Sequence, residues 1–152
     1  VTCADGQIRW KKRPPRSKIS VGDIAGSIDK DGYRRIFLKG RPYVSSRIAW
    51  LVHKGTFPKG QIDHINNDVS DNRIENLRDV TSKQNSYNRR KPCSNTSGYK
   101  GVTFHKRDKK WQASVEVDGR TKFLGYFNSP EKAHQAYCSA VDEIHGPYAN
   151  HG

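Results

Sequence analysis

The chain has 152 residues, of which 28 are Lys or Arg and 15 are Asp or Glu, so its formal net charge at pH 7 is +13. Only 33% of the residues are hydrophobic, which excludes one large core and favours small modules. A chain this basic repels itself unless a polyanion screens it, so nucleic acid is the expected partner. No apolar run approaches a membrane-spanning length, and no basic helix has a strongly apolar opposite face, so we expect no membrane partner.

The three cysteines, Cys3, Cys93 and Cys138, lie far apart and form no CxxC pair. This spacing indicates neither a zinc knuckle nor a disulfide framework, and reduced thiols are the simple interpretation. The first residues lack the pattern of a signal peptide, so we expect an intracellular protein. The chain contains no Met even at position 1, which suggests a trimmed start.

The first region, residues 1–60, combines a predicted hairpin with a predicted helix. Residues 33–44 alternate between apolar and polar around a Lys-Gly turn, which predicts the hairpin. Residues 45–53 predict a short helix that ends at Gly55. One side of this helix carries Ile48, Leu51 and Val52. The basic, proline-broken stretch 11–18 is interpreted as a solvated loop rather than a contact surface.

The second region, residues 61–90, is polar and rich in Asn and Asp. Its predicted elements follow in the order strand 62–65, loop 66–76, strand 77–80 and helix 82–88. Thr81 and Gln84 have the spacing of a capping box at the start of that helix. So few apolar residues support this region that we expect a bound ion to help hold it together.

The polar loop has two other interpretations. Asn and Asp favour turns on their own account, so the loop could be an Asn-rich turn region. A calcium loop of the EF-hand type fits poorly, because the twelfth position from Asp63 is Ile74 where a bidentate acid is needed, and no Gly occupies the sixth position.

Four residues of this region resemble the motif of the HNH endonucleases, the ββα-metal nucleases of the phage and intron homing type. They are the adjacent Asp63 and His64, Asn76 after the loop, and Asn85 on the following helix. The surrounding stretches 71–78 and 81–85 match the same pattern. Many relatives open the preceding helix with His-Arg, where this chain has Ser46 and Arg47.

This resemblance implies a nuclease that hydrolyses phosphodiester bonds in DNA. His64 would act as the general base, since neutral imidazole has a pKa near working pH. Asp63 and Asn85 would hold one divalent ion, and Asn76 would brace the loop and orient His64. Oxygen ligands favour Mg²⁺ or Mn²⁺ over Zn²⁺. The expected products carry 5′-phosphate and 3′-hydroxyl ends.

The third region, residues 98–150, follows a linker-like stretch at 91–97 and predicts a sheet with one helix. The predicted strands are 99–105, 110–117 and 120–127, with Asp118 and Gly119 in the second turn. Ser129 would cap a helix that begins at Pro130 and stops at Gly146. We expect one small core between the helix stripe and the inner sheet face. The stripe is Ala133, Ala136, Tyr137, Ala140, Val141 and Ile144, and the sheet face is Val102, Phe104, Trp111, Ala113, Val115 and Leu124.

The stretches 99–102, 111–113 and 123–127, with the Ala-rich helix, resemble an AP2-type DNA-binding domain. The resemblance implies that the outer sheet face lies in the major groove of duplex DNA. The facing positions would be Lys100, Thr103, His105, Gln112, Ser114, Glu116, Thr121 and Phe123. The basic residues expected to contact DNA around this face are Arg107, Lys109, Lys110 and Arg120, with Arg89 and Arg90 ahead of it. Gln112 and Arg107 are the better candidates for base edges.

The sequence therefore predicts an α+β protein. It combines a small ββα-metal nuclease core at residues 61–90 with a three-stranded antiparallel sheet packed on one helix, and residues 1–60 brace the nuclease core. We interpret it as a metal-dependent endonuclease that nicks or cuts double-stranded DNA as a monomer or homodimer, without a small-molecule cofactor. If it is phage-encoded, as the resemblance implies, it works in the cytoplasm of a bacterial host. The alternatives are a non-catalytic DNA-binding protein or regulator with a degenerate nuclease fold, and an RNA-binding protein.

Overall fold

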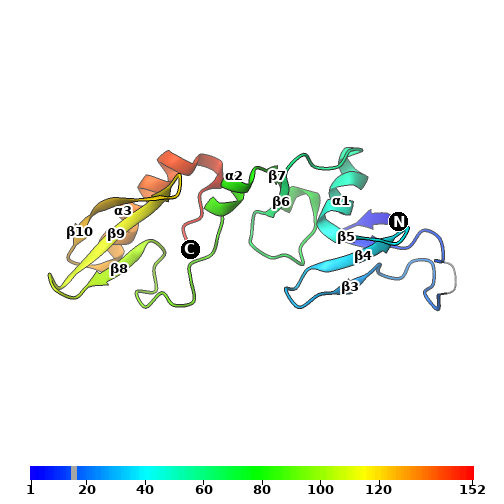
Figure 1. Ribbon diagram of the computed structural model, residues 1–152, viewed down its shortest axis with the longest axis horizontal. Helices are drawn as coiled ribbons and strands as arrows, with labels where there is room; N and C mark the ends of the chain where they lie inside the picture. The colour runs from blue at the N-terminus through cyan, green and yellow to red at the C-terminus, as the bar shows by residue number, and fades with distance from the viewer. Residues whose placement is uncertain (15–16) are drawn as a thin grey trace. The chain divides into compact units, whose positions relative to one another are not determined.

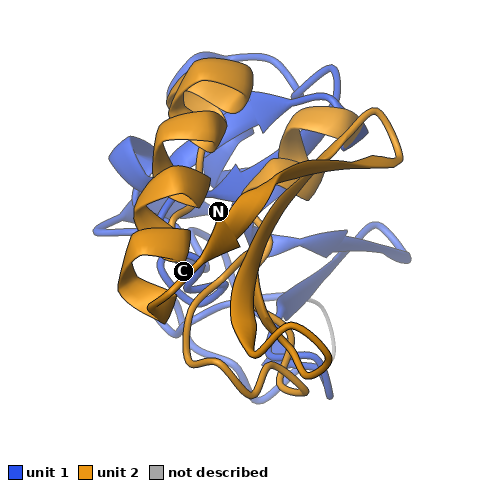
Figure 2. Cartoon of the chain, turned by 90° about the vertical axis from the view of Figure 1, so that its left-hand side faces the viewer, with its two compact units in different colours: residues 1–82 blue, residues 83–152 orange. Residues whose placement is uncertain are grey.

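A computed structural model of the chain describes residues 1–14 and 17–152 (Figure 1). Pro15 and Arg16, which belong to the basic stretch 11–18, lie outside the described residues. The chain forms two compact units, Val1–Ser82 and Lys83–Gly152, coloured blue and orange in Figure 2. Helices and small antiparallel sheets make up both units, so the predicted α+β class is confirmed. Within the described residues, no helix is long and apolar enough to cross a membrane.

Short antiparallel strands and one α-helix are the main elements of the first unit. In chain order its elements are β1 (Thr2–Ala4), β2 (Gln7–Arg9), β3 (Ser27–Ile28), β4 (Arg34–Leu38), β5 (Arg41–Val44), α1 (Ser45–Lys54), β6 (Gln61–His64), the 3-10 helix η1 (Ile74–Asn76) and β7 (Leu77–Val80). Among the described residues of this unit, the strands form three sheets, β1 with β2, β3 with β4 and β5, and β6 with β7. The predicted hairpin and helix are confirmed as β4–β5 and α1, which ends with Gly55 in the left-handed conformation.

One apolar cluster joins the N-terminal strands to the polar middle region. It consists of the buried residues Ile8, Ala25, Ile36, Ile48, Ala49 and Leu77. Leu77 comes from β7, and Ile62 on β6 packs against the same cluster, so the strands that carry the motif are anchored by residues 1–60. The predicted apolar side of α1 was partly wrong, because Val52 is 43% exposed and Ala49 is buried in its place.

The second unit contains most of α2 (Ser82–Tyr87), then β8 (Val102–His105), β9 (Lys110–Val117), β10 (Arg120–Phe127), α3 (Pro130–His145) and the 3-10 helix η2 (Gly146–Tyr148). The strands form one antiparallel sheet, as predicted, and their order in it is β10-β9-β8. Asp118 and Gly119 join β9 to β10 with φ of 51° and 73°, the left-handed values that a tight hairpin turn requires. Ser129 caps α3 by accepting a 3.3 Å hydrogen bond from the Lys132 amide.

Helix α3 covers the inner face of this sheet. Its buried residues Ala133, Tyr137 and Val141 pack against Val102, Ala113 and Val115. The helix lies so close to the turn before β8 that a Cβ on Gly101 would fall 2.0 Å from the Tyr137 ring. Phe104 is a correction to the predicted core, because it is 41% exposed at the sheet edge, where its ring lies 4.9 Å from that of Trp111.

The stretch predicted as a linker, residues 91–97, is tied to the start of the second unit's sheet. The side-chain amide of Asn95 donates to the Tyr99 carbonyl, and the Ser97 hydroxyl donates to the carbonyl of Val102. The domain boundaries expected at residues 60, 90 and 97 remain predictions, since the compact units divide at Ser82. Cys3, Cys93 and Cys138 are free thiols, in agreement with the sequence.

Candidate active site

Asp63 and His64 are the last two residues of β6, and both are buried, with 6% and 5% of their surface exposed. In the register with β7, Asp63 faces Arg78 and His64 faces Leu77. Alternation along a strand directs the two adjacent side chains to opposite faces of the β6–β7 pair. The carboxylate of Asp63 contacts Arg78 on the neighbouring strand, and the imidazole of His64 contacts Asn72 in the loop that follows β6.

The entry to β6 is fixed from two sides. Arg47 on α1 donates to the carbonyls of Pro58 and Gly60 over 3.2 and 2.8 Å. The carboxylate of Asp79 on β7 accepts hydrogen bonds of 2.8 Å from the backbone amides of Lys59 and Gly60. Arg47, the second residue of the Ser-Arg pair, thus has a structural contact that anchors the strand carrying Asp63 and His64.

Asp63 makes an ion pair across the strands. Its Oδ2 accepts a 2.7 Å hydrogen bond from Nε of Arg78. The two side chains are only 7% and 18% exposed, so water screens the pair poorly.

His64 contacts a side chain that the sequence analysis did not single out. Its Nε2 lies 3.1 Å from Oδ1 of Asn72. The amide nitrogen of Asn72 lies 3.1 Å from the Ser45 hydroxyl and 3.2 Å from the Ser70 carbonyl. The ring of Tyr33 lies on the same side, 6.5 Å from that of His64 between centroids. Asn72 could not be distinguished from its neighbours in an Asn-rich loop, because the contact depends on how the loop closes.

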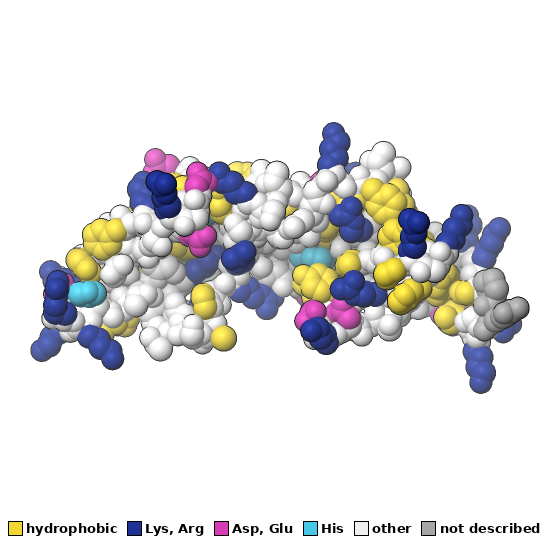
Figure 3. Space-filling model, in the orientation of Figure 1, with side chains coloured by type: hydrophobic (Ala, Val, Ile, Leu, Met, Phe, Trp, Pro, Cys, Tyr) yellow, Lys and Arg dark blue, Asp and Glu magenta, His cyan; other side chains and the backbone are white. Residues whose placement is uncertain are grey.

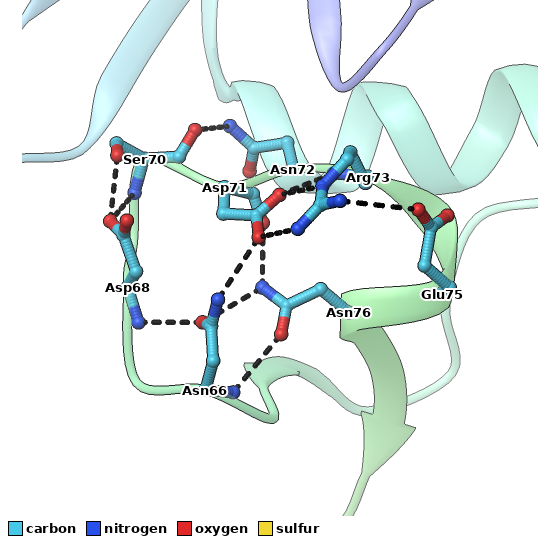
Figure 4. Close-up of polar contacts among 8 residues, drawn as sticks. All are labelled: Asn66, Asp68, Ser70, Asp71, Asn72, Arg73, Glu75 and Asn76. Atoms are coloured by element: carbon cyan, nitrogen blue, oxygen red, sulfur yellow. Dashed lines mark hydrogen bonds and ion pairs between the residues drawn. The ribbon is translucent and has the colours of Figure 1, made fainter.

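Asn76 closes the loop between β6 and β7 (Figure 4). Its Oδ1 accepts from the Asn66 amide over 3.0 Å, and its Nδ2 donates to Asn66 Oδ1 and to the Asp71 carbonyl over 2.9 and 2.8 Å. These bonds are the bracing that the family resemblance implied for Asn76. Orientation of His64 was assigned to the same residue, and here the structure differs, because the Asn76 side chain bonds to Asn66 and Asp71 while Asn72 contacts His64.

Two carboxylates of this loop are held in their charged form. A side-chain hydrogen bond from Arg73 lowers the pKa of Asp71 to about 2. The hydroxyl and amide of Ser70 lower the pKa of Asp68 from its ordinary value. Both residues therefore stay anionic at neutral pH and keep the loop's hydrogen bonds, drawn in Figure 4, intact.

The fourth motif residue, Asn85, belongs to α2, and the part of α2 that lies in the second unit is joined to that unit by several side-chain contacts. Tyr87 stacks on His145 with centroids 3.8 Å apart, and the side chain of Asn150 donates to Asn88. Lys83 pairs with Asp118. Within residues 1–14 and 17–152, no group of three or more His, Cys, Asp and Glu gathers as a metal cluster.

A second candidate surface is the outer face of the β8–β9–β10 sheet. The register aligns Thr103 with Gln112, Ser114 with Phe123, and Glu116 with Thr121, and these positions alternate with the buried ones. Phe123 is 53% exposed, and its ring lies 5.0 Å from that of Tyr126, which lies 5.2 Å from that of His105. Tyr126 completes this aromatic row and was missing from the predicted set.

Lys100 was expected on the outer face, and this expectation was wrong. Its ammonium donates to the backbone carbonyls of Arg89 and Asn150. Burial lowers its pKa to about 8. The side chain of Lys100 therefore joins two segments of the second unit and does not lie on the outer sheet face. The basic residues expected to contact DNA, Arg89, Arg90, Arg107, Lys109, Lys110 and Arg120, are all exposed. Lys and Arg side chains stand out from the surface in Figure 3.

Comparison with known proteins bears on this geometry. The family model described as HNH endonuclease matches residues 43–87, which include Asp63, His64, Asn76 and Asn85. Protein 3.8 of Escherichia phage T7 is 33% identical over 92 residues, which cover 60% of this chain and 74% of that protein. The chain belongs to the HNH endonuclease family. A nuclease-type activity on DNA follows at the level of the family, whose members generally use divalent metal ions.

Other relatives of the chain are matched over smaller shares of their length. An uncharacterized HNH endonuclease of Acanthamoeba polyphaga mimivirus is 28% identical over 123 residues, 80% of this chain but 63% of that protein. APETALA2-like protein 2 of Oryza sativa subsp. indica is 36% identical over 58 residues, 38% of this chain and 13% of the plant protein. The likeness to AP2 proteins therefore covers a small part of each plant chain. No solved structure matches the chain.

Proposed function

We propose that this HNH endonuclease hydrolyses phosphodiester bonds of double-stranded DNA with His64 as its general base and one divalent ion. The observation that supports this role best is a buried imidazole at the end of β6, hydrogen-bonded through one ring nitrogen and adjacent to a buried carboxylate. The contact with Asn72 fixes the position of the imidazole, and a general base must be held within hydrogen-bond reach of the water that it activates.

The metal ligands we propose are Asp63 and Asn85. The family motif supports the pair, and the donor chemistry fits it, because a carboxylate and an amide oxygen are hard ligands. With no acidic cluster among the described residues, water and a DNA phosphate would complete the shell. Such a set suits Mg²⁺ or Mn²⁺ better than Zn²⁺. When bound, the ion would neutralise charge that develops on the phosphate and on the leaving oxygen.

The residues of the chain would then act as follows. His64 takes a proton from a water molecule as the water oxygen forms a bond to phosphorus. The bond from phosphorus to the 3′ oxygen breaks, and that oxygen takes up a proton from solvent. The products carry 5′-phosphate and 3′-hydroxyl ends. Asn76 takes no part in the proton transfer and holds the loop beside β6 closed.

We propose that the second unit is an AP2-like DNA-binding module. Gln112 lies on the exposed face of the sheet beside the aromatic row, where an amide can read base edges in a major groove. The other contacts that we propose on this face are Thr103, His105, Ser114 and Phe123. The basic residues Arg89, Arg90, Arg107, Lys109, Lys110 and Arg120 would contact phosphates, which position the protein on DNA.

One active site cleaves one DNA strand in each binding event, so we propose that a monomer nicks DNA. Cleavage of both strands would require a homodimer. Similarity to a protein of phage T7 supports a phage origin and action in the cytoplasm of a bacterial host.

The test is conversion of supercoiled plasmid by the wild type and His64→Ala, each with Mg²⁺, Mn²⁺ or EDTA. We expect metal-dependent nicking by the wild type and its loss in His64→Ala. Equal cleavage by both proteins would exclude His64 as the base. If neither protein cleaves DNA but both bind it, the non-catalytic DNA-binding alternative is correct.

A further inference from the structure

The contact between His64 and Asn72 determines which ring nitrogen of His64 carries the hydrogen. It does so because the other partners of the Asn72 side-chain amide determine which end of that amide is the oxygen. The carbonyl of Ser70 lies 3.2 Å from one end of that amide. A carbonyl can only accept a hydrogen bond, so this end must be the NH₂ group. The opposite end, 3.1 Å from Nε2 of His64, is therefore the oxygen.

An amide oxygen can only accept, so Nε2 of His64 must carry the hydrogen in this contact. A neutral imidazole has one N–H group, and its other nitrogen holds the lone pair. The partner of Nε2 thus assigns the lone pair of His64 to Nδ1. A general base takes a proton through a lone pair, so Nδ1 is the atom that would act on water.

Hydrogen bonds hold the side chain of Asn72 in place, and the β1–β2 turn packs against its backbone. Its NH₂ group also donates to the Ser45 hydroxyl over 3.1 Å. Asn72 and Ser45 are only 5% and 2% exposed, so water competes little for these bonds. The β1–β2 turn packs against the same segment, where a Cβ on Gly6 would fall 2.7 Å from the Asn72 carbonyl carbon.

We propose that Asn72 is the positioning residue that holds His64 in the Nε2–H tautomer, and that Ser45 on α1 and the Ser70 carbonyl hold the Asn72 amide in turn. The inference rests on the proposed role of His64 as the base. Two residues of the same loop then have different roles. Asn76 closes the loop, and Asn72 determines the tautomer of the His64 ring.

The first measurement is made on the full chain without metal. Labelling the six histidines with ¹⁵N and recording long-range proton–nitrogen spectra at mildly alkaline pH distinguishes the protonated nitrogen from the bare one, and His64→Gln identifies the signals of His64. We expect the hydrogen on Nε2 in the wild type and a mixture of tautomers in Asn72→Leu, which keeps the size of the side chain but no polar atom. A hydrogen on Nδ1 in the wild type would overturn the proposal.

The second measurement is single-turnover nicking with wild-type affinity for DNA checked in parallel. Loss of a partner that orients a metal-ligating His costs about 10- to 100-fold in activity, and we take this as the order of magnitude for a partner that orients a His base. We expect a loss of that order in the single-turnover rate constant for Asn72→Leu with DNA affinity unchanged, and a smaller loss in Ser45→Ala. Asn72→Asp keeps an oxygen towards Nε2 but sets its other oxygen against the Ser70 carbonyl, so it should recover only part of the rate. Ser46→Ala is the matched control, since Ser46 is equally buried at 3% and should retain full activity.

The outcomes separate this proposal from the proposed function. If His64→Ala is inactive while Asn72→Leu and Ser45→Ala cleave at the wild-type rate, Asn72 is not a positioning residue and the nuclease assignment stands. If the wild type does not cleave DNA, the proposed function fails, and the tautomer of His64 still decides the role of Asn72. If Asn72→Leu does not fold, the wild-type spectrum and the comparison of Ser45→Ala with Ser46→Ala decide it.

Discussion

Arg78 donates a 2.7 Å hydrogen bond from Nε to Oδ2 of Asp63, directly across the register of β6 and β7. The carboxylate that we propose as a metal ligand therefore has a cationic partner from the neighbouring strand. A divalent ion bound there would share Asp63 with Arg78, which keeps the buried carboxylate neutralised in the absence of metal. Stability and metal response should consequently be linked at this pair.

We expect Arg78→Ala to lower the free energy of unfolding by on the order of 2 kcal/mol, because it leaves a nearly buried carboxylate without its charged partner. Added Mn²⁺ should restore part of the loss. Chemical denaturation with and without Mn²⁺ measures both effects. Arg73→Ala is the control, since its 2.7 Å pair with Asp71 has an Arg that is 53% exposed and should matter less. Wild-type stability of Arg78→Ala would show that the pair contributes little.

The bracing by Asn76 gives a second prediction. Asn76→Ala removes buried hydrogen bonds to Asn66 and Asp71 and should lower the free energy of unfolding by about 2 kcal/mol. Asn76→Asp should not rescue it, because an oxygen would then face the Asn66 oxygen and the Asp71 carbonyl. Denaturation midpoints measure this, with Glu75→Ala, an exposed neighbour, as control. Recovery in Asn76→Asp would contradict the assigned amide orientation.

Local chemistry explains what the sequence predicted well. The Asp118 and Gly119 turn, the Ser129 cap and the helix end at Gly55 each depend on a few adjacent residues, and each is found in the structure. The order of strand, loop, strand and helix around Asp63 and His64 was predictable for the same reason. The β1–β2 hairpin was not predicted, because three-residue strands carry too short an alternation to stand out.

Contacts between distant residues account for the remaining differences. Asn72 meets Ser45, which is 27 positions away, only because α1 packs beside the loop. Lys100 has the sequence context of a surface lysine, yet the C-terminal turn brings the Asn150 carbonyl to its ammonium. Neither partner can be inferred from spacing, since each depends on how separate elements pack.

Lys100 gives a pH dependence of stability. Burial lowers its pKa to about 8 from an ordinary 10.5, so the unfolded chain binds this proton more tightly between those values. The free energy of unfolding should therefore gain a contribution that rises with pH from about 8 to 10.5. Denaturation at a series of pH values should show this rise in the wild type relative to Lys100→Met. Parallel curves for the two proteins would mean that Lys100 keeps an ordinary pKa.

Tyr137 should act in the opposite direction at higher pH. Burial raises the pKa of its phenol to about 12 from an ordinary 10.0, so the folded chain retains this proton longer than the unfolded chain does. The contribution to stability is complete below pH 10 and is lost as the pH rises towards 12. Comparison with Tyr137→Phe over this range isolates the effect. A variant that loses stability as steeply as the wild type would assign the decline to other groups.

The outer sheet face gives the last prediction. Phe123 leaves β10 on the exposed face opposite Ser114, whereas the adjacent Lys122 faces Val115 on the helix-covered side. Apolar contact with thymine methyl groups is one way that a protein reads the major groove, so Phe123→Ala should weaken binding to duplex DNA by about tenfold. Lys122→Ala, which removes a positive charge from the same strand, should weaken it less if this face enters the groove.

The measurement is fluorescence anisotropy with duplex DNA at fixed salt, in a His64→Ala background that prevents cleavage. The same measurement over a salt series gives the slope of log affinity against log salt. We expect the magnitude of this slope to be lower by about one in Arg120→Gln than in the parent protein, because one phosphate contact is lost. If Lys122→Ala weakens binding as much as Phe123→Ala and both flatten the salt slope, the protein binds DNA by charge alone. The outer sheet face would then not be the DNA-binding surface.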